Sequence, residues 1–408
     1  MDFGKFYVRC IDDDTDRPIE GAFVRISYSG DPEGAIETLR TDSSGVTQTI
    51  SLSAPPVELS LQPQALQPYS EYTVFASAEG YESVNVEGNE IFGNETAILN
   101  IRMLPLARNN TAQSFTIGDH TLYGDYPPKI PESEIKDVSE TGEIVLSRVV
   151  IPEYVVVHDG PPSDRSTKDY YVPYKDYVKN VASSEIYATW PEATIIANIL
   201  AIMSFTLNRV FTEWYRNKGY DFTITSSTAF DHKWINNRNI FENISRTVDT
   251  IFTNYLSRPG IIQPILTQYC DGKRVTCPNW MSQWGSKALG DKGYTAIEIL
   301  RNYYGDNMYI NTSETVSGVP SSWPGYNLTV GSSGDKVRMM QMQLNVISDA
   351  YPLIGKIQAD GIYGENTAQA VRTFQKVFDL PQTGVVDFKT WYKISEIYVG
   401  VSKIAELV

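Results

Sequence analysis

The chain has few of the residues on which disulfide frameworks and metal sites are built. Its 408 residues include only three cysteines and three histidines, which are Cys10, Cys270, Cys277, His120, His158 and His232. Three cysteines are too few for a disulfide framework. Cys270 and Cys277 bracket the stretch CDGKRVTC, which could close a hairpin disulfide, supply two metal ligands, or have no special role. Zinc sites usually need four ligands at closer spacing, so we expect no metal and no cofactor.

Positive charge and long apolar runs are also scarce. The net charge is -15 and the isoelectric point is near 4.8. Nucleic acids and anionic membranes attract clustered Lys and Arg, so we expect neither as a partner. The first 21 residues alternate apolar and polar and lack the apolar core of a secretory signal, so export by the standard route is not expected. The apolar run at 193–207 is shorter than the roughly 18 residues of a membrane span and predicts a buried core helix.

The composition that is present indicates several domains. Hydrophobic residues make up 42% of the chain, enough for more than one core. Short alternating runs and turn-rich stretches up to residue 103 predict a β-sandwich, whereas prolines and acidic residues at 127–143 are typical of a linker. We expect a multidomain α+β protein with a β-sandwich at 1–105, a linker at 106–149, an α+β domain at 150–312, a short linker at 313–325 and three helices at 326–408.

The last of these domains has a specific pattern. Its main features are the apolar stripes of two predicted helices, a third short helix near Asp387, and a glycine turn in ADGIYGENT. The first stripe is Val337, Met340, Leu344 and Ile347, and the second is Val371, Phe374 and Phe378. With its fixed glycines, this segment resembles the three-helix peptidoglycan-binding module. The resemblance implies wall binding through Asp360, Tyr363, Phe374 and Trp391. A generic helical bundle is the alternative.

The first domain carries a weaker pattern. The stretches DRPIEGAFVRI, TDSSGV and YTVFASAEGY follow one another within its first 81 residues. Together they resemble the transthyretin-like, carboxypeptidase-regulatory-like modules. That resemblance implies a spacer, chaperone or adhesive unit rather than a catalytic one.

One carboxylate stands in an unusual context. Glu185 shares a predicted helix face with Tyr177 and Val181, and the buried helix after Pro191 follows it closely. Glu185 could be a structural residue that binds the free amides of that next helix, which would lower its pKa. It could instead be a half-desolvated acid with a raised pKa, suited to general acid catalysis. The pattern alone leaves both interpretations open.

The central domain supplies a resemblance that favours the second interpretation. The stretches VASSEIYATWPEA, YDFTITSSTAFDHKWI and MSQWGSKALGDKGYTAIEILRNYYG resemble the lytic domain of stage II sporulation protein D, which cleaves peptidoglycan glycan strands. The resemblance implies that Glu185, before the WPEA helix start, is the catalytic acid. Glycine-rich SGG and GHG elements of that family are replaced here by CDG and CPNW, which puts any metal of that family in doubt.

The chemistry also favours one carboxylate. Ordinary glycosidases use two, and the sequence shows no clear second partner for Glu185. A lytic transglycosylase can act with one, because the C6 hydroxyl of muramic acid is the nucleophile. Weaker candidates, as groups that line the cleft and bind sugars, are Thr228, Asp231, His232, Tyr269, Asp271 and Gln283.

The order of the domains resembles that of the clostridial spore cortex-lytic enzymes. This implies an inactive precursor in the cortex region of the spore, with cortex peptidoglycan as substrate and a subtilisin-like germination protease as activator. The expected cut lies near Arg148, Val149 and Val150, and the sandwich or the linker would block the sugar cleft. The alternatives are an amidase that cuts the lactyl–peptide bond and a non-catalytic scaffold that binds the wall.

Overall fold

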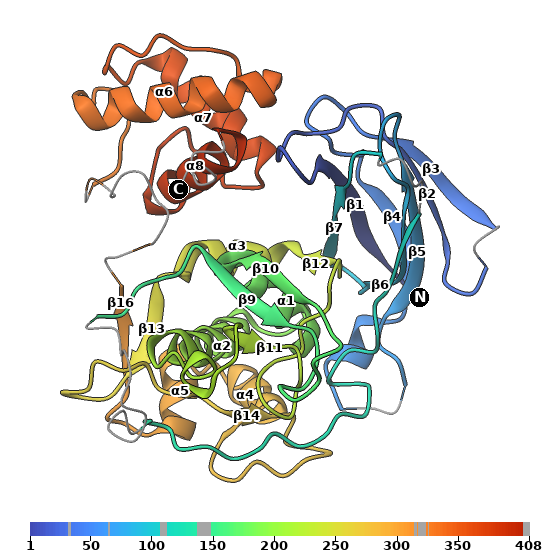
Figure 1. The fold of residues 1–408 in the computed structure, drawn as a ribbon, viewed down its shortest axis with the longest axis vertical. Coiled ribbons are helices and arrows are strands. Elements are labelled where there is room, and N and C mark those ends of the chain that lie inside the picture. The colour runs from blue at the N-terminus through green and yellow to red at the C-terminus, as the bar shows by residue number, and fades with distance from the viewer. Residues whose placement is uncertain are drawn as a thin grey trace.

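The computed structural model describes residues 1–31, 34–63, 66–106, 112–136, 148–313, 316, 324 and 326–402. The protein is mixed α+β, as the sequence predicts. Figure 1 shows a β-domain at the right, a central domain of helices and short strands below, and a group of three helices at the top.

The amino-terminal β-domain consists of two sheets. Its strands are β1 (Asp2–Asp12), β2 (Phe23–Tyr28), β3 (Ala35–Arg40), β4 (Ile50–Ala54), β5 (Ser70–Ser77), β6 (Val84–Ile91), β7 (Thr96–Met103) and β8 (Gln113–Thr116). One sheet has the order β3-β2-β5-β6-β8 and the other contains β7-β1-β4. Alternate residues of β1 such as Phe6, Val8 and Cys10 are fully buried between them. Since β8 pairs with β6, this domain extends past the predicted boundary at 105.

The central domain surrounds one buried helix. Its elements are β9 (Tyr154–His158), β10 (Asp169–Pro173), α1 (Tyr174–Glu185), α2 (Glu192–Phe211), β11 (Ile224–Thr225), β12 (Ile240–Phe241), α3 (Glu242–Ile251), β13 (Asn254–Ser257), β14 (Tyr269–Cys270), β15 (Met281–Ser282), α4 (Gln283–Gly290), α5 (Ala296–Tyr304) and β16 (Tyr309–Thr312). Helix α2 is longer than the predicted 193–207. Among the described residues it alone has the length and apolarity to cross a membrane, but 89% of its most apolar stretch is buried inside the protein.

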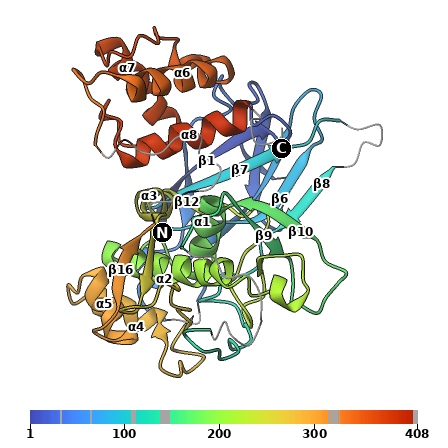
Figure 2. The ribbon, with the colours of Figure 1, turned by 60° about the vertical axis from the view of Figure 1, so that its left-hand side comes forward.

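A strand of the central domain completes a sheet of the β-domain. β12 pairs antiparallel with β7, with Ile240 opposite Ile98 and Phe241 opposite Ala97, and Figure 2 shows the two strands together. Next to this junction the Arg238 guanidinium forms a buried ion pair with Glu90, at 2.5 Å. The β-domain is therefore built into the fold of the central domain rather than attached by a flexible spacer.

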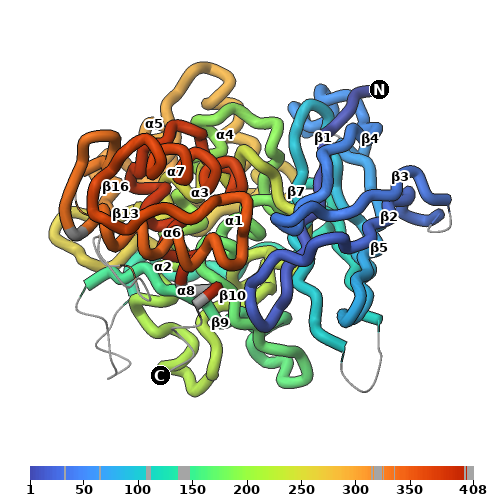
Figure 3. The backbone as a smooth tube through the Cα atoms, turned by 90° about the horizontal axis from the view of Figure 1, so that it is seen from above, coloured from blue at the N-terminus to red at the C-terminus, as the bar shows by residue number. Residues whose placement is uncertain are grey.

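The carboxyl-terminal helices are α6 (Asp335–Ala350), α7 (Glu365–Val377) and α8 (Phe388–Ser402), so the third helix is present and longer than expected. The predicted stripes are buried, with Met340, Leu344 and Phe374 at most 1% exposed. Seen from above in Figure 3, these helices lie over α1 and α3, with the β-domain beside them. Arg9 of the β-domain reaches them through an ion pair with Asp379, at 3.0 Å.

Candidate active site

Glu185 is the last residue of α1, and the fold buries it. The predicted face is confirmed, because Tyr177 and Val181 are fully buried and Glu185 is only 4% exposed. The backbone N–H of Lys233 donates to Glu185 Oε1 at 2.6 Å, and Gln283 Nε2 donates to the Glu185 carbonyl at 2.9 Å. The donors to the Glu185 carboxylate are the Lys233 amide and, at 3.5 Å, Gln283 Nε2, and neither belongs to the first turn of α2.

Opposing effects set the charge of this carboxyl group. Burial raises the pKa of Glu185, because the ionised form loses its hydration. The Lys129 ammonium, the Lys233 amide and the Tyr269 hydroxyl lower it in part, and the pKa remains above its ordinary value. The Tyr269 hydroxyl is buried beside Glu185, and burial together with the negative charge of Glu185 raises the pKa of Tyr269 well above its usual range. A buried carboxyl group with a raised pKa is suited to general acid catalysis toward a bound ligand.

The carboxyl group opens onto a small cavity. Its volume is about 90 Å³. Four of the predicted sugar-binding residues line it together with Glu185: Thr228, Tyr269, Asp271 and Gln283. Pockets that hold drug-sized ligands measure roughly 300–1,000 Å³, so a sugar chain does not fit this cavity as it stands.

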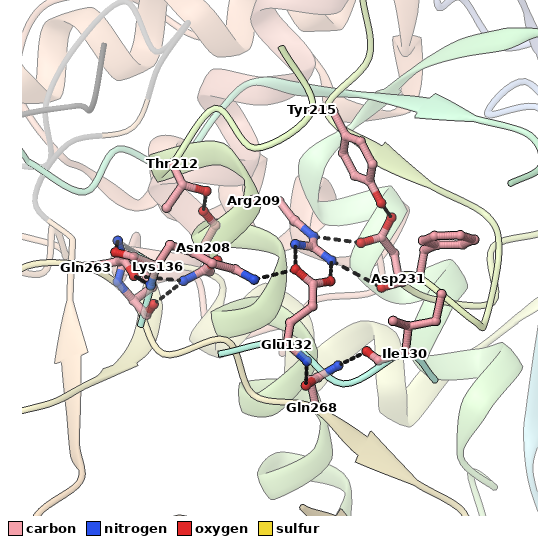
Figure 4. A network of polar contacts seen from close by, with 12 residues as sticks. Ile130, Glu132, Lys136, Asn208, Arg209, Thr212, Tyr215, Asp231, Gln263 and Gln268 are labelled. Atoms are coloured by element: carbon pink, nitrogen blue, oxygen red, sulfur yellow. Dashed lines mark hydrogen bonds and ion pairs between the residues drawn. The ribbon is translucent and has the colours of Figure 1, made fainter. Parts of the chain in front are cut away.

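The other two predicted sugar-binding residues do not line the cavity. Asp231 is fully buried, and its carboxylate accepts hydrogen bonds from Arg209 Nε and Tyr215 Oη, both at 2.7 Å. His232 is also fully buried, with Nδ1 2.9 Å from Tyr177 Oη and its ring stacked against Tyr269. Burial lowers the pKa of His232 far below its usual range, so the imidazole is neutral. Both residues therefore pack behind the residues that line the cavity, His232 against Tyr269 and, as Figure 4 shows, Asp231 against Arg209.

The two neighbouring cysteines form a disulfide. Cys270 and Cys277 are bonded, with their Cα atoms 5.6 Å apart, and Cys10 is free and buried. Inside the closed loop the Asp271 carboxylate accepts from the backbone amides of Lys273 at 3.2 Å, Arg274 at 3.0 Å and Val275 at 2.9 Å. In the described part of the chain no three His, Cys, Asp or Glu residues are grouped so that they could hold a metal ion.

Sequence reasoning missed three residues that shape the site: Lys129, Lys233 and Arg274. Lys129 belongs to the segment that composition marks as a linker, yet its side chain is buried against the site. Lys233 acts through its backbone amide, which any residue carries. Arg274 donates to the carbonyls of Tyr123 at 2.6 Å and Thr121 at 3.0 Å. No sequence pattern marks the contacts of Lys129 and Arg274, because each joins segments more than 100 residues apart.

The predicted wall-binding residues of the carboxyl-terminal helices differ in exposure. Tyr363, Phe374 and Trp391 are at most 1% exposed, so they form the core of this domain rather than a contact surface. Asp360 is exposed, and its carboxylate accepts from the Ile362 amide at 2.9 Å. The glycine turn that contains it is thus tied down locally.

The expected cleavage region lies where described structure resumes after residue 147. Arg148 is exposed, whereas Val149 is buried and its carbonyl accepts from Ser313 Oγ at 2.8 Å. Ile151 is buried and forms a bridge with Val316. Residues 137–147 of the predicted linker lie outside the described part of the chain.

Residues 333–394 match the family described as putative peptidoglycan binding domain, and this match points to association with the cell wall. None of the curated proteins matches the chain. Similar solved structures include the SleB N-terminal domain, 27% identical over 19% of this chain and 99% of that one, with a TM-score of 0.17.

Two further structures are less similar in sequence. GBS52, the minor pilin of Streptococcus agalactiae, is 18% identical over 28% of this chain and 48% of that one, with a TM-score of 0.19. The 5-hydroxyisourate hydrolase of Klebsiella pneumoniae is 18% identical over 25% of this chain and 92% of that one, with a TM-score of 0.17. TM-scores this low carry no argument about fold or function.

Proposed function

We propose that the chain is the inactive precursor of a spore cortex-lytic enzyme of the clostridial SleC type. It would act as a lytic transglycosylase that cleaves the glycan strand between muramic acid and N-acetylglucosamine. The observation that carries the proposal is Glu185, a buried carboxyl group with a raised pKa that opens onto a cavity lined by polar side chains. The peptidoglycan-binding match at 333–394 supports the choice of polymer.

The geometry suits a single acid–base residue. Protonated Glu185 would give its proton to the glycosidic oxygen as the bond from the muramic acid C1 breaks. The resulting carboxylate, held by the Lys233 amide, would accept the proton of the C6 hydroxyl as that oxygen bonds to C1 and closes the 1,6-anhydro ring. Tyr269 lines the same cavity and would contact the sugar.

Besides Glu185, the described residues that line the cavity include two carboxylates, Asp125 and Asp271, and the Asp125 carboxylate is fully exposed to solvent, 3.7 Å from Arg274. Asp271 lines the cavity, but its carboxylate is engaged by three backbone amides of its own loop. A carboxylate held in this way is poorly placed to activate water or to form a covalent intermediate. This arrangement supports a transglycosylase over a two-carboxylate hydrolase.

Activation would occur in the cortex region through a subtilisin-like protease. Because Arg148 is exposed and Val149 is buried and tethered to Ser313, the protease would approach from the amino-terminal side of Val149. Exposed chain is the usual substrate of such proteases.

The test treats cortex peptidoglycan with the full chain after protease processing, beside Glu185→Gln and the control Glu192→Gln. The full chain is used because β12 completes a sheet of the β-domain. Glu192 is an exposed carboxylate seven positions further along the chain. Mass spectrometry should find anhydro-muramic ends with the wild type and the control, and at least about 100-fold fewer with Glu185→Gln.

Other products would contradict the proposal in distinct ways. Reducing ends would indicate hydrolysis, and free peptides would indicate the amidase. Equal activity of Glu185→Gln and the wild type would place catalysis elsewhere. Binding without any product would indicate the scaffold.

A further inference from the structure

Helices α6, α7 and α8, here called the module, pack directly on the central domain. In Figure 2 helix α8 lies between α6 and α3. The Phe252 ring, which follows α3, packs against two rings of α8, with its centre 6.0 Å from that of Phe388 and 5.5 Å from that of Tyr392. Phe252 is only 3% exposed. This buried aromatic contact excludes water from the junction of the module with the central domain.

Charged side chains form a network across the same junction. On α1, the Lys179 ammonium lies 2.9 Å from Asp249 Oδ2 of α3, and the Lys175 ammonium lies 3.4 Å from Oδ1 of the same residue. Lys175 also pairs with Glu396 of α8, whose other oxygen accepts from Lys393 of α8 at 2.7 Å. The side chains of Lys175, Lys179 and Asp249 are at most 11% exposed. Helices α1, α3 and α8 are therefore joined by one set of largely buried ion pairs.

The network favours one orientation of α8. Buried ion pairs contribute little net stability, but separating their members leaves charges without partners, so one arrangement of the helices that carry them is preferred. A second contact lies in the first turn of α8, where Lys389 Nζ donates to the Arg246 carbonyl at 3.2 Å and to the Thr250 hydroxyl at 3.3 Å. Because Lys389 and Glu396 are two turns apart on α8, contacts at both positions prevent the helix from pivoting on α3.

Helix α1 connects this junction to the catalytic position. Lys175 and Lys179 lie in its first two turns, and Glu185 is its last residue. At a rise of about 1.5 Å per residue, Lys175 and Glu185 are about 15 Å apart along the helix axis. A polymer bound to the docked module therefore lies at a fixed distance and direction from Glu185. A module on a flexible tether would instead hold the polymer anywhere within reach of that tether.

We propose that the module and the central domain bind one glycan chain as a single rigid unit, in which the docked module sets where along the chain Glu185 acts. The inference rests on the proposed function, because it adds substrate positioning to the same Glu185 site. The junction is formed by residues within 175–252 and 388–396, which all follow the expected cut, so processing leaves it intact. A rigid unit requires a minimum chain length for tight binding, because a shorter chain reaches only one of the two surfaces.

The first experiment measures docking in the full chain after protease processing. Spin labels at Lys292→Cys and Gln369→Cys, which are both exposed positions, report the distance between the central domain and the module. The native cysteines do not interfere, because Cys10 is buried and the other two are disulfide-bonded. Double electron–electron resonance should give one narrow distance distribution. A broad distribution would overturn the inference, because the module would then be tethered rather than docked.

Two substitutions in one chain should release the module. Glu396→Lys breaks the ion pair between α8 and α1, and Asp379→Asn removes the ion pair with Arg9 of the β-domain. The matched control is Asp349→Lys with Glu365→Gln, which changes two exposed carboxylates of the module. The first pair should broaden the distance distribution and the control should not. A distribution that stays narrow in the first pair would overturn the assignment of docking to the charge network.

The second experiment measures binding by calorimetry, on processed protein with Glu185→Gln so that no chain is cleaved. The probes are muramidase-derived cortex glycan fragments of graded length. In docked protein the affinity should rise at least about tenfold in one step, at the length that reaches both surfaces. In the released variant the rise should be gradual, because a tether lets the two surfaces approach each other. Docked protein that retains Glu185 should release anhydro-ended products with a common minimum length.

The outcomes separate the two proposals. A step in affinity without any product supports the rigid unit and overturns the lytic function. Anhydro-ended products together with a gradual rise in docked protein support the lytic function and overturn the rigid unit. A step of the same size at the same length in the released variant also overturns the rigid unit, because docking would then have no effect on binding.

Discussion

Replacing Glu132 with Gln should loosen the segment at residues 117–136, here called the strap, which lies across the cavity; the substitution removes the charge of Glu132 and keeps the size of its side chain. Burial opposes ionisation of Glu132, but hydrogen bonds and charge from Arg209 and Lys136 lower its pKa to about 2. Each pH unit by which a pKa falls corresponds to about 1.4 kcal/mol, so a fall from 4.5 to about 2 favours the ionised form by about 3 kcal/mol. Removal of one member of a buried ion pair costs about 3–5 kcal/mol.

Of the range of about 3–5 kcal/mol, the lower end is expected for Glu132→Gln. Arg209 retains a second carboxylate partner, because its Nε donates to Asp231 at 2.7 Å, so the guanidinium is not left unpaired. We expect Glu132→Gln to lower the free energy of strap detachment by about 3 kcal/mol, which is a factor of about 100 in the opening equilibrium.

Hydrogen exchange of the Glu132 and Ile130 amides at pH 7 measures this opening directly. The sign of the pH dependence follows from the lowered pKa: the stabilisation is complete above about 4.5 and is lost as the pH falls toward 2. Asp125→Asn is the control, because Asp125 is a fully exposed carboxylate on the same strap and its ion pair with Arg274 is long, at 3.7 Å. The reasoning would be refuted if Glu132→Gln and the wild type exchanged at the same rate at pH 7. It would also be refuted if the substitution accelerated exchange as much at pH 2 as at pH 7.

Two further predictions concern the disulfide loop and a half-buried acid of the β-domain. Cys277→Ser removes the disulfide with Cys270 and should lower the free energy of unfolding by about 2 kcal/mol in urea titrations. It should also accelerate amide hydrogen exchange at Tyr123 and Gly124, because Arg274 of the same loop donates to their carbonyls. An unchanged free energy of unfolding would contradict this prediction. Burial and the nearby Glu242 raise the pKa of Glu95 from 4.5 to about 7, so the protein loses stability as the pH rises from about 4.5 to about 7, and the loss is complete above that range. Glu95→Gln should therefore stabilise the protein by about 1–3 kcal/mol at pH 8 and hardly at all at pH 4.5, whereas the exposed control Glu87→Gln should change neither value.

Periodicity in the sequence predicted the helices well, because each helix buries a face that its own residues define. The stripe of Tyr177, Val181 and Glu185 predicts α1, and the apolar run after Pro191 predicts α2 within a few residues of its end. The carboxyl-terminal stripes likewise predict α6 and α7. Boundaries set by pairing between distant strands were harder, and β8 was missed because only its contact with β6 makes it a strand.

The sequence by itself determined that Glu185 is an acid on the buried face of a helix. Only the tertiary structure decided which groups surround its carboxylate, because the Lys233 amide and the Lys129 ammonium come from separate segments. The same holds for residues 117–136. Their composition is that of a solvated linker, since proline and acidic residues cannot form a core of their own. The fold brings Arg209 and Gln268 alongside them, and partners that are remote in sequence turn this linker into a strap across the cavity.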